Sequence, residues 1–246
     1  MASYRFGKSP AVKDERTLMF KKYLGPGLAP APPTFNSLDR LETTIGIRDV
    51  ATLFPMDGND RYGDCVLAAK AHLITNFHGL VGRTEIMPEA DVIRYYLELS
   101  GGEDSGLVML STLRHWQRTG FGDHKIAAFV GLEEHDVEDV KSAIYLFGGV
   151  DLGFRVQDRA ISDFEAGKVW TPGPTDGGGH CVVAIGYWEG GVILLTWGGL
   201  VRASWEWWYE MVDESYAVLP PEAREKGFAP GYDYAGLASD LVLIQG

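Results

Sequence analysis

One cysteine of this chain stands where a polar loop meets an apolar segment. The loop runs from Asn59 to Asp64 and contains Gly63, and Cys65 is followed by the alanine-rich stretch 66–74. We expect a helix to begin at Cys65. A helix N-terminus carries partial positive charge and unpaired N–H groups, which lower the pKa of a thiol and favour the reactive thiolate. The position therefore suggests a nucleophile, and the alternative is a small core residue, because free cysteine is often buried.

A cysteine nucleophile needs a base, and His180 has the most favourable setting for that role. It follows the glycine-rich loop 176–179, in which Asp176 is a nearby carboxylate, and it begins a strand at the rim of a sheet. Cys181 comes next, so its side chain points to the opposite face, and we interpret it as a core residue rather than a disulfide partner of Cys65. The other histidines have weaker settings: His72 as a hydrogen-bonded core residue, His78 and His115 within helical segments, and His124 and His135 in polar turns.

The elements that would position these residues change along the chain, from helices to strands. Helical spacing and end signals predict helices over 65–80, 88–100, 107–116 and 136–147. Runs rich in β-branched and aromatic residues predict strands over 125–130, 150–156, 180–187, 192–197 and 216–219. The aromatic run 205–209 is interpreted as core packing. Helices first and strands later indicate an α+β protein with two segregated lobes.

Residues 1–37 are predicted to form an extended N-terminal arm, because glycine and proline at 25–33 disfavour helix and sheet. The first 22 residues hold six basic and two acidic side chains, a net charge of +4 that leaves −16 on the remainder. Such an arm would dock on its own body, join subunits of a homo-oligomer, or cover a cleft as a built-in inhibitor; a solvated tail is the alternative. We further expect a helical lobe over 38–135, a β-rich lobe with the histidine over 136–219, and a C-terminal extension over 220–246.

Composition excludes several classes of protein. The chain has 246 residues with 46% hydrophobic and 23% charged content, which is ordinary for a globular protein. A net charge of −12 argues against nucleic-acid binding. No apolar run approaches the roughly 20 residues of a membrane span. There is no secretory signal, so we expect a cytoplasmic location, with virion or particle association as an alternative. Two cysteines, and six histidines without paired-ligand spacing, predict no metal site and no cofactor.

The motifs together resemble those of papain-like cysteine peptidases. Gly63-x-Cys65 heads a buried helix, the segment 179–187 (GHCVVAIGY) resembles the family's Gly-His-Ala-Val-x-x-Val-Gly-Tyr strand, and Thr196-Trp197-Gly198 stands where the family has Asn-Ser-Trp-Gly. The resemblance covers roughly residues 50–219, in order. The signatures Asn-Asp-x-x-Gly-Asp-Cys and Thr-Trp-Gly also resemble those of a group of bacterial and phage proteins.

The resemblance implies a papain-like two-lobe fold of the α+β class. A helical lobe would carry the central cysteine helix, and an antiparallel β-barrel-like lobe would carry the histidine, with the active site in the cleft between them. Cys65 would be the nucleophile for a peptide or protein substrate, and His180 the general base and then acid. Trp197 would shield the imidazole, and the backbone N–H of Cys65 would donate to the oxyanion together with Asn59.

Departures from the family pattern leave two functions open. The family's oxyanion glutamine is Asn59 here, which is one methylene shorter, and the triad asparagine falls at Leu195, which cannot orient an imidazole. Thr196, Asp176 or a water are the candidate replacements. Asp64 would raise the thiol pKa unless it serves as the helix N-cap. The chain is thus either an active thiol peptidase or amide-bond acyl transferase, or a catalytically weak papain-fold protein with a structural or binding role in a particle or oligomer.

Overall fold

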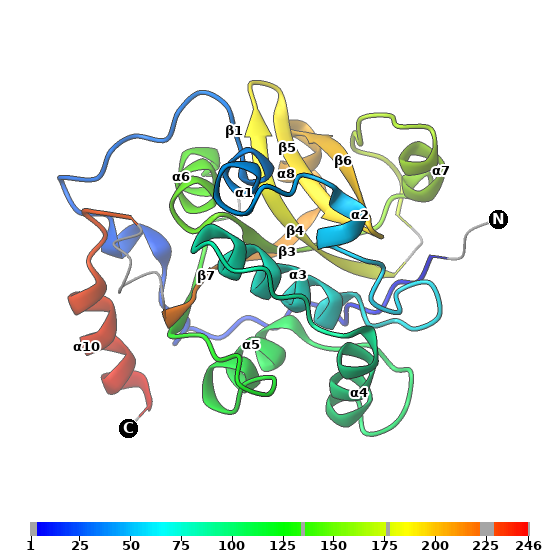
Figure 1. The fold of residues 1–246 in the computed structure, drawn as a ribbon, viewed down its shortest axis with the longest axis horizontal. Coiled ribbons are helices and arrows are strands. Elements are labelled where there is room, and N and C mark those ends of the chain that lie inside the picture. Colours follow the sequence, from blue (N-terminus) through cyan, green and yellow to red (C-terminus); the bar gives the residue numbers. More distant parts are fainter. Residues whose placement is uncertain (1–3, 134–135, 176–177, 222–228, 246) are drawn as a thin grey trace.

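A buried helix separates a group of helices from a twisted antiparallel sheet (Figure 1). The fold is that of a computed structural model, which describes residues 4–133, 136–175, 178–221 and 229–245. The helices are η1 (Phe20–Tyr23), α1 (Ser37–Ile45), α2 (Val50–Leu53), α3 (Cys65–Leu80), α4 (Glu89–Leu99), α5 (Met109–Arg118), α6 (Val137–Phe147), α7 (Ala160–Glu165), α8 (Trp205–Met211) and α10 (Tyr234–Gln245). The strands are β1 (Phe35–Asn36), β2 (Ala128–Gly131), β3 (Val150–Arg155), β4 (Gly179–Trp188), β5 (Gly191–Thr196), β6 (Gly199–Ser204) and β7 (Val212–Leu219).

Helix α3 is the central element, and it spans the residues that the sequence predicted. Its residues 65–77 are all buried, because their side chains are apolar or small on nearly every side. A helix that is apolar all round needs neighbours all round. Strand β4 packs on one side of α3, and helices α1, α4 and α5 pack on the others. This arrangement holds the first residue of the helix, Cys65, against the sheet.

The sheet has the strand order β2-β7-β3-β4-β5-β6, with β1 added to β4. Every neighbouring pair is antiparallel, which confirms the mixed α+β fold. Within the described residues the two ends of this order, β2 and β6, do not pair with each other, so the sheet is open. The expected barrel-like closure is therefore too strong a description.

Most predicted elements are present, with small shifts at their ends. Asp136 caps α6 as expected, since its carboxylate accepts a hydrogen bond from the Asp139 N–H at 3.2 Å. Helix α1, which the sequence did not predict, begins at Ser37 with Asn36 as its N-cap. Strand β6 was also missed, because it follows β5 after a turn of only two residues, Trp197 and Gly198. Within the described ranges, no helix has both the length and the apolar composition to cross a bilayer.

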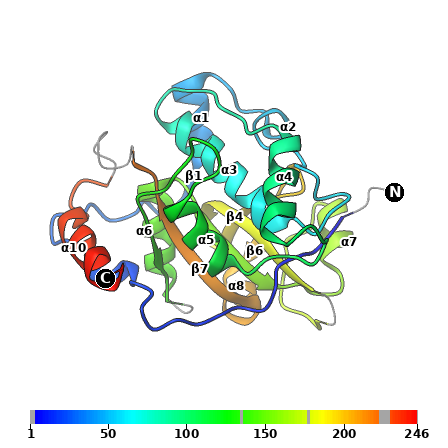
Figure 2. The same cartoon turned by 90° about the horizontal axis from the view of Figure 1, so that it is seen from below.

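The N-terminal arm is docked on its own body and is not a solvated tail. It crosses the whole width of the molecule, from the N-terminus to η1 beside α10 (Figures 1 and 2). Phe20 and Tyr23 of η1 are buried and contact the ring of Tyr232. Strand β1, near the end of the arm, pairs with β4. The lobe boundaries at residues 135 and 219 stay predictions, although β2, from the range assigned to the helical lobe, pairs with β7.

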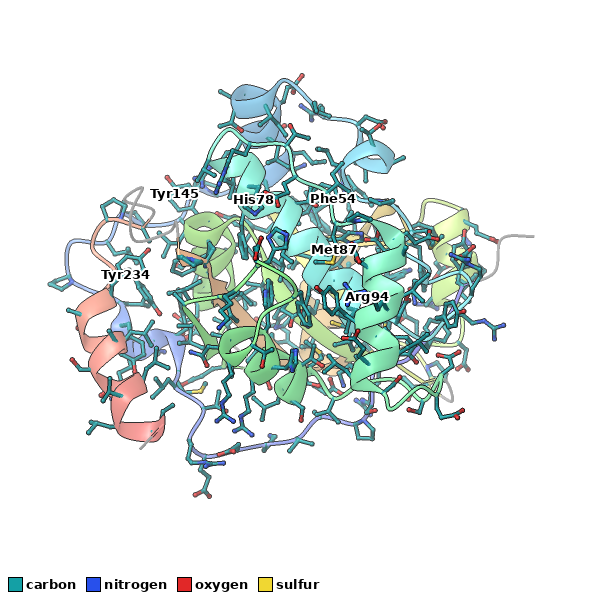
Figure 3. The ribbon with its side chains drawn as sticks, turned by 60° about the horizontal axis from the view of Figure 1, so that its bottom comes forward. Phe54, His78, Met87, Arg94, Tyr145 and Tyr234 are labelled. Atoms are coloured by element: carbon teal, nitrogen blue, oxygen red, sulfur yellow. The ribbon has the colours of Figure 1, made fainter. Side chains whose placement is uncertain are left out.

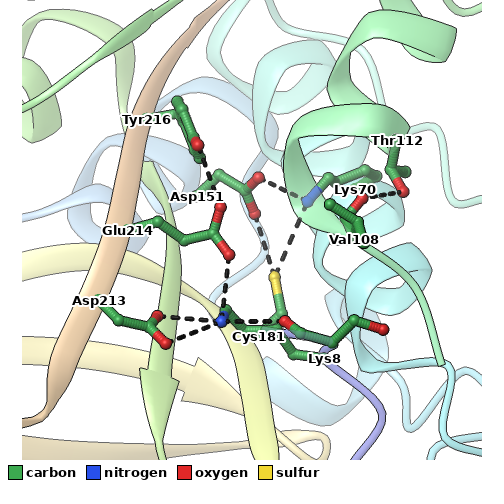
Figure 4. Close-up of polar contacts among 10 residues, drawn as sticks. Lys8, Lys70, Val108, Thr112, Asp151, Cys181, Asp213, Glu214 and Tyr216 are labelled. Carbon is green, nitrogen blue, oxygen red and sulfur yellow. Dashed lines mark hydrogen bonds and ion pairs between the residues drawn. The ribbon is translucent and has the colours of Figure 1, made fainter. Parts of the chain in front are cut away.

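A buried ion pair joins α3 to the sheet. Lys70 of α3 and Asp151 of β3 are both fully buried and bonded to each other, and the Cys181 thiol donates to Asp151 at 3.3 Å (Figure 4). Burial alone would lower the pKa of Lys70, but the facing Asp151 carboxylate outweighs it and the pKa is raised. Cys181 is thus a buried residue with a free thiol, as the sequence predicted. The pair helps to fix the rotation of a helix whose buried residues are mostly apolar.

We predict that Lys70→Met lowers the free energy of unfolding by about 3–5 kcal/mol, because it leaves the Asp151 carboxylate buried and unpaired. The double variant Lys70→Met/Asp151→Leu should lose less than this single variant, since it removes both charges together. Urea unfolding of wild type, both single variants and the double variant measures the coupling. Additive losses would contradict the pairing.

Candidate active site

Cys65 lies at the first position of α3 with its thiol buried; the residue is 1% exposed. Backbone amides of Cys181, which follows His180, and of Gly7 in the N-terminal arm lie at the thiol. Burial raises the pKa of Cys65 to about 11, and these amides and the charge of Lys70 act in the opposite direction but are outweighed. The expectation of a lowered thiol pKa is therefore wrong for this arrangement, because the thiol is shielded from water.

His180 lies near the start of β4, with its imidazole held by one hydrogen bond and three aromatic rings. Its Nε2 is 2.8 Å from Thr196 Oγ1. The Trp197 indole stacks on the imidazole, with ring centroids 4.8 Å apart and planes at 24°, and Phe154 and Phe6 meet it edge-on. Nδ1 is buried and has no hydrogen-bond partner among the described residues. Burial lowers the pKa of His180 to about 3, so the ring is neutral.

The geometry at the end of β5 places Thr196, and not Leu195, beside His180. Successive side chains of a strand point to opposite faces. Leu195 points into the core that surrounds α3, and Thr196, the next residue, meets His180. Trp197 then adopts a φ of +49°, in the left-handed region, and Gly198 follows at +70°. A positive φ is strained for a tryptophan, and this turn places the Trp197 indole on the His180 imidazole.

The loop before Cys65 is held by hydrogen bonds from both of its ends. The Asn59 side-chain amide donates to the Tyr62 carbonyl at 3.1 Å, so it is turned into its own loop. The Gly63 N–H donates to Asp104 Oδ1 at 2.8 Å. The Tyr96 hydroxyl also contacts Asp104 and accepts from the Gly106 N–H at 3.0 Å. An oxyanion role for Asn59 stays a prediction.

Comparison with solved structures identifies the architecture. Xylellain, a cysteine protease from Xylella fastidiosa, is similar with a TM-score of 0.66 and 15% identity over 89% of this chain and 97% of that chain. ProCathepsin B S9 from Trypanosoma congolense follows at 0.59, with 16% identity over 87% of this chain and 86% of that one. The Carica candamarcensis cysteine protease CMS1MS2, in complex with E-64, is similar at 0.54, with 13% identity over 77% of this chain and 99% of that chain.

The chain has the papain-like fold. No protein-family model matches the sequence, and no curated protein matches it either. At 13–16% identity, the likeness to the solved structures shows the fold alone. The features of the site that follow therefore come from the geometry of this chain.

In this papain-like fold the cleft between the helices and the sheet is occupied by the N-terminal arm. The Lys8 N–H donates to the Gly179 carbonyl at 3.0 Å on the sheet side. On the helical side, the Leu107 N–H donates to the Gly7 carbonyl at 2.8 Å, and the Ser9 N–H donates to the Leu107 carbonyl at 2.9 Å. The groove here has Gly63 and residues 104–106 on one wall, 178–179 on the other, and residues 5–10 of the arm between them.

Aromatic residues of the arm cover the histidine side of the cleft. Phe6 contacts both the His180 imidazole and the Trp197 indole, and Tyr4 packs on the same indole with ring centroids 4.8 Å apart. The Arg5 N–H donates to the Asn59 carbonyl at 2.9 Å. The arm is thus an extended segment that is bonded to both walls and covers the site.

The remaining histidines fall in other places. His72 is buried and contacts the Pro55 carbonyl at 2.9 Å and Asp57 at 3.1 Å, which confirms a hydrogen-bonded core histidine. Asp176 and His135 lie outside the described residues.

A candidate set of cation ligands lies near the end of α3 that is far from Cys65. His78 (Figure 3), Glu85 and His124 bring one ligand atom each within 4.8 Å of one another, so they could hold a divalent cation. Sequence spacing gave no signal for this group, because its members come from three separate segments.

Asp64 stands at the N-cap position of α3 without making the expected cap hydrogen bond. Its side chain is buried, and burial raises its pKa to about 8; contact with Asn59 opposes the shift, and the charges of Asp57 and Asp104 add to it. The raised pKa favours the protonated carboxyl of Asp64. The charge of Asp64 is one of the causes that raise the pKa of Cys65, as the sequence suggested.

We predict that Asp64→Asn changes the pH dependence of stability. Because the folded pKa is raised from 3.8 to about 8, stability is fully present below pH 3.8 and is lost as pH rises through about 8. The loss is at most about 1.4 kcal/mol per pH unit. Asparagine does not ionise, so Asp64→Asn should not lose stability in this way. Measured in urea at pH 5, 6.5 and 8, its unfolding free energy minus that of wild type should increase as the pH rises.

The matched control is Asp60→Asn, the same substitution on a side chain of the same loop that is 43% exposed. Its unfolding free energy should depend on pH in the same way as that of wild type. Parallel curves for Asp64→Asn and wild type would show that Asp64 is ionised in the folded protein.

Proposed function

We propose that this chain is a thiol peptidase or amide-bond acyl transferase that uses a Cys65–His180 pair and is closed by its own N-terminal arm. The observation that carries the proposal is that an extended peptide segment already lies in the cleft. It is bonded to Gly179 on one wall and to Leu107 on the other, and the backbone of Gly7 lies at the Cys65 thiol. A cleft that holds one extended peptide over a thiol is suited to hold a substrate peptide in the same place.

The contact between His180 Nε2 and Thr196 Oγ1 is compatible with the tautomer that this chemistry needs. If the Nε2–H donates to Thr196 Oγ1, Nδ1 keeps its lone pair and serves as the base. Nδ1 takes the thiol proton while sulfur attacks the substrate carbonyl carbon, and the oxyanion forms near the backbone N–H of Cys65. The tetrahedral intermediate collapses to a thioester as the imidazolium returns the proton to the leaving amine. Water then completes hydrolysis, or a second amine completes acyl transfer.

The arm blocks this chemistry in two ways. It occupies the substrate position, and it excludes water from both reacting groups. With the arm seated, burial raises the pKa of Cys65 to about 11 and lowers that of His180 to about 3, so both groups are neutral over most of the pH range. Displacement of the arm would rehydrate them and favour proton transfer from thiol to imidazole. A similar solved structure bears the name proCathepsin B, which accords with a closed precursor.

A second candidate is a papain-fold binding or structural protein with little or no turnover. Leu195 at the position of the triad asparagine favours it, because a leucine cannot orient an imidazole. In that case the arm would be a permanent part of the fold, and a place in a particle or an oligomer would be its use. The two candidates differ in whether Cys65 becomes reactive when the arm leaves.

We predict that Gly7→Val releases the arm and exposes Cys65. A Cβ at position 7 would lie 1.7 Å from the Gly63 carbonyl oxygen, so the segment cannot seat with a side chain there. A thiol with a pKa of 11 is about 0.01% ionised at pH 7, and one with a pKa near 8.5 is about 3% ionised. Alkylation of Cys65 by iodoacetamide, located by mass spectrometry, should accelerate at least about 100-fold.

Gly27→Val is the matched control, because it is the same substitution in the same arm and a Cβ there meets nothing within 4 Å. It should react as slowly as wild type. Slow alkylation of Gly7→Val across pH 5 to 9, no faster than a free thiol with a pKa near 8.5, would favour the structural candidate.

We also predict that Thr196→Val, made in the Gly7→Val background, slows Cys65 alkylation at pH 7 at least about tenfold. Valine keeps the shape of threonine but cannot accept the Nε2–H, so the proton is free to move to Nδ1. Thr196→Ser keeps the hydroxyl and should retain most of the rate. Equal rates for the valine and serine variants would show that Thr196 does not orient the imidazole.

A further inference from the structure

The side chain of Lys8 enters a pocket beside the candidate site. Its ammonium is 3.0 Å from Asp213 and 3.1 Å from Glu214, and the Lys8 side chain is 1% exposed (Figure 4). The same nitrogen donates to the Ser9 carbonyl at 3.2 Å. A buried ammonium with two carboxylates and a carbonyl around it has a full set of charged and polar partners.

The pocket has the shape for an unbranched basic side chain as well as the charge. A Cβ on Gly153 would lie 2.2 Å from the Lys8 Cε and 2.6 Å from the Met109 sulfur. Only glycine at 153 therefore leaves room for the hydrocarbon stem of Lys8. The Tyr216 hydroxyl donates to the other oxygen of Glu214 at 3.0 Å and fixes the orientation of this carboxylate.

The charges of the pocket favour a cation. Burial raises the pKa of Glu214, and the charge of Lys8 opposes this shift. The neighbouring cation on the helical side, Lys70, is bonded to Asp151. When Lys8 leaves, Glu214 and the 25%-exposed Asp213 lose the ammonium that bridges them. A buried carboxylate without a partner is strongly unfavourable, so the empty pocket favours a second cation.

The position of Lys8 in the cleft makes this pocket available to a substrate. Its backbone pairs with Gly179, and the preceding residue, Gly7, places its backbone at the Cys65 thiol. The pocket therefore receives a side chain one residue away from the peptide group that faces the nucleophile. A bound peptide that replaced the arm would present a side chain at the same point.

We propose that Asp213 and Glu214 form a specificity pocket for a lysine or arginine side chain of a peptide bound in the cleft, with Lys8 as its internal occupant. This rests on the function proposed above, and it names the substrate class as peptides with a basic residue next to the reacting group. The arm then acts as a substrate-like inhibitor, since it offers the cleft the side chain that the pocket selects.

The test measures peptide binding to the full chain carrying Gly7→Val, in which the pocket is intact and the arm cannot seat. The probes are two fluorescent nonapeptides with the sequence of residues 4–12, one with lysine at position 8 and one with norleucine, which lacks the charge. Fluorescence anisotropy should give at least tenfold tighter binding of the lysine peptide. Glu214→Gln and Asp213→Asn, each added to this background, should reduce that preference to less than threefold.

Glu210→Gln is the matched control, since it removes the same charge from an exposed side chain nearby and should keep the preference. Thermal unfolding checks each variant, and Asp213→Asn, at a more exposed position, carries the test if Glu214→Gln does not fold. The proposal fails if the two peptides bind equally, if the lysine peptide does not bind, or if both pocket variants keep the preference.

Binding and thiol reactivity separate the two proposals. A preference for the lysine peptide in a protein whose Cys65 stays unreactive would support the specificity pocket and contradict the proposed chemistry. A reactive Cys65 without a preference for the lysine peptide would contradict only the proposed specificity pocket.

Discussion

The burial of α3 on every side is the constraint on which the rest of this structure depends. Because the helix is apolar all round, it needs β4 on one side and helices on the others, and its N-terminus is thereby fixed at the end of β4 that carries His180. An evenly apolar helix could still turn about its axis. Buried polar residues of α3 remove that freedom, since one rotation brings Lys70 to Asp151 and His72 to Asp57. The placement of Cys65 thus follows from packing and from these buried polar contacts.

General attraction between a basic arm and an acidic body explains little of how the arm is held. The exposed pairs of Lys21 with Asp136 and of Lys22 with Asp240 lie at the surface, where such contacts contribute little. The seat in the cleft depends on buried features: the Lys8 ammonium, backbone pairing with both walls, and aromatic rings over the histidine. The surface charges of the arm thus contribute little to its docking, and Lys8 provides the specific buried contact.

Local patterns in the sequence predicted much of this fold. The alanine-rich run after Cys65 gave α3, and the Asp136 cap gave α6. For the partner of His180 the sequence left Thr196, Asp176 or a water open, and the structure places the Thr196 hydroxyl at the imidazole. The properties that failed depend on distant segments. Burial of Cys65 within the folded chain raises the thiol pKa against the backbone amides of Cys181 and Gly7, and nothing next to Cys65 in the sequence encodes that burial. Lys8 looked like one surface charge among six, because its two carboxylates are more than 200 residues along the chain.

The glycine and the lysine at positions 7 and 8 of the arm have a joint consequence for alignment. Backbone pairing alone would tolerate a slip by one residue, since every peptide unit offers the same N–H and C=O. Here a slip in either direction would put Phe6 or Lys8 against the Gly63 carbonyl, where no Cβ fits, and would withdraw the ammonium from its carboxylates. The need for glycine at position 7 and for the charged side chain of Lys8 at the next position together define the alignment of the arm. The arm therefore has a single register in the cleft, although most of its length is irregular.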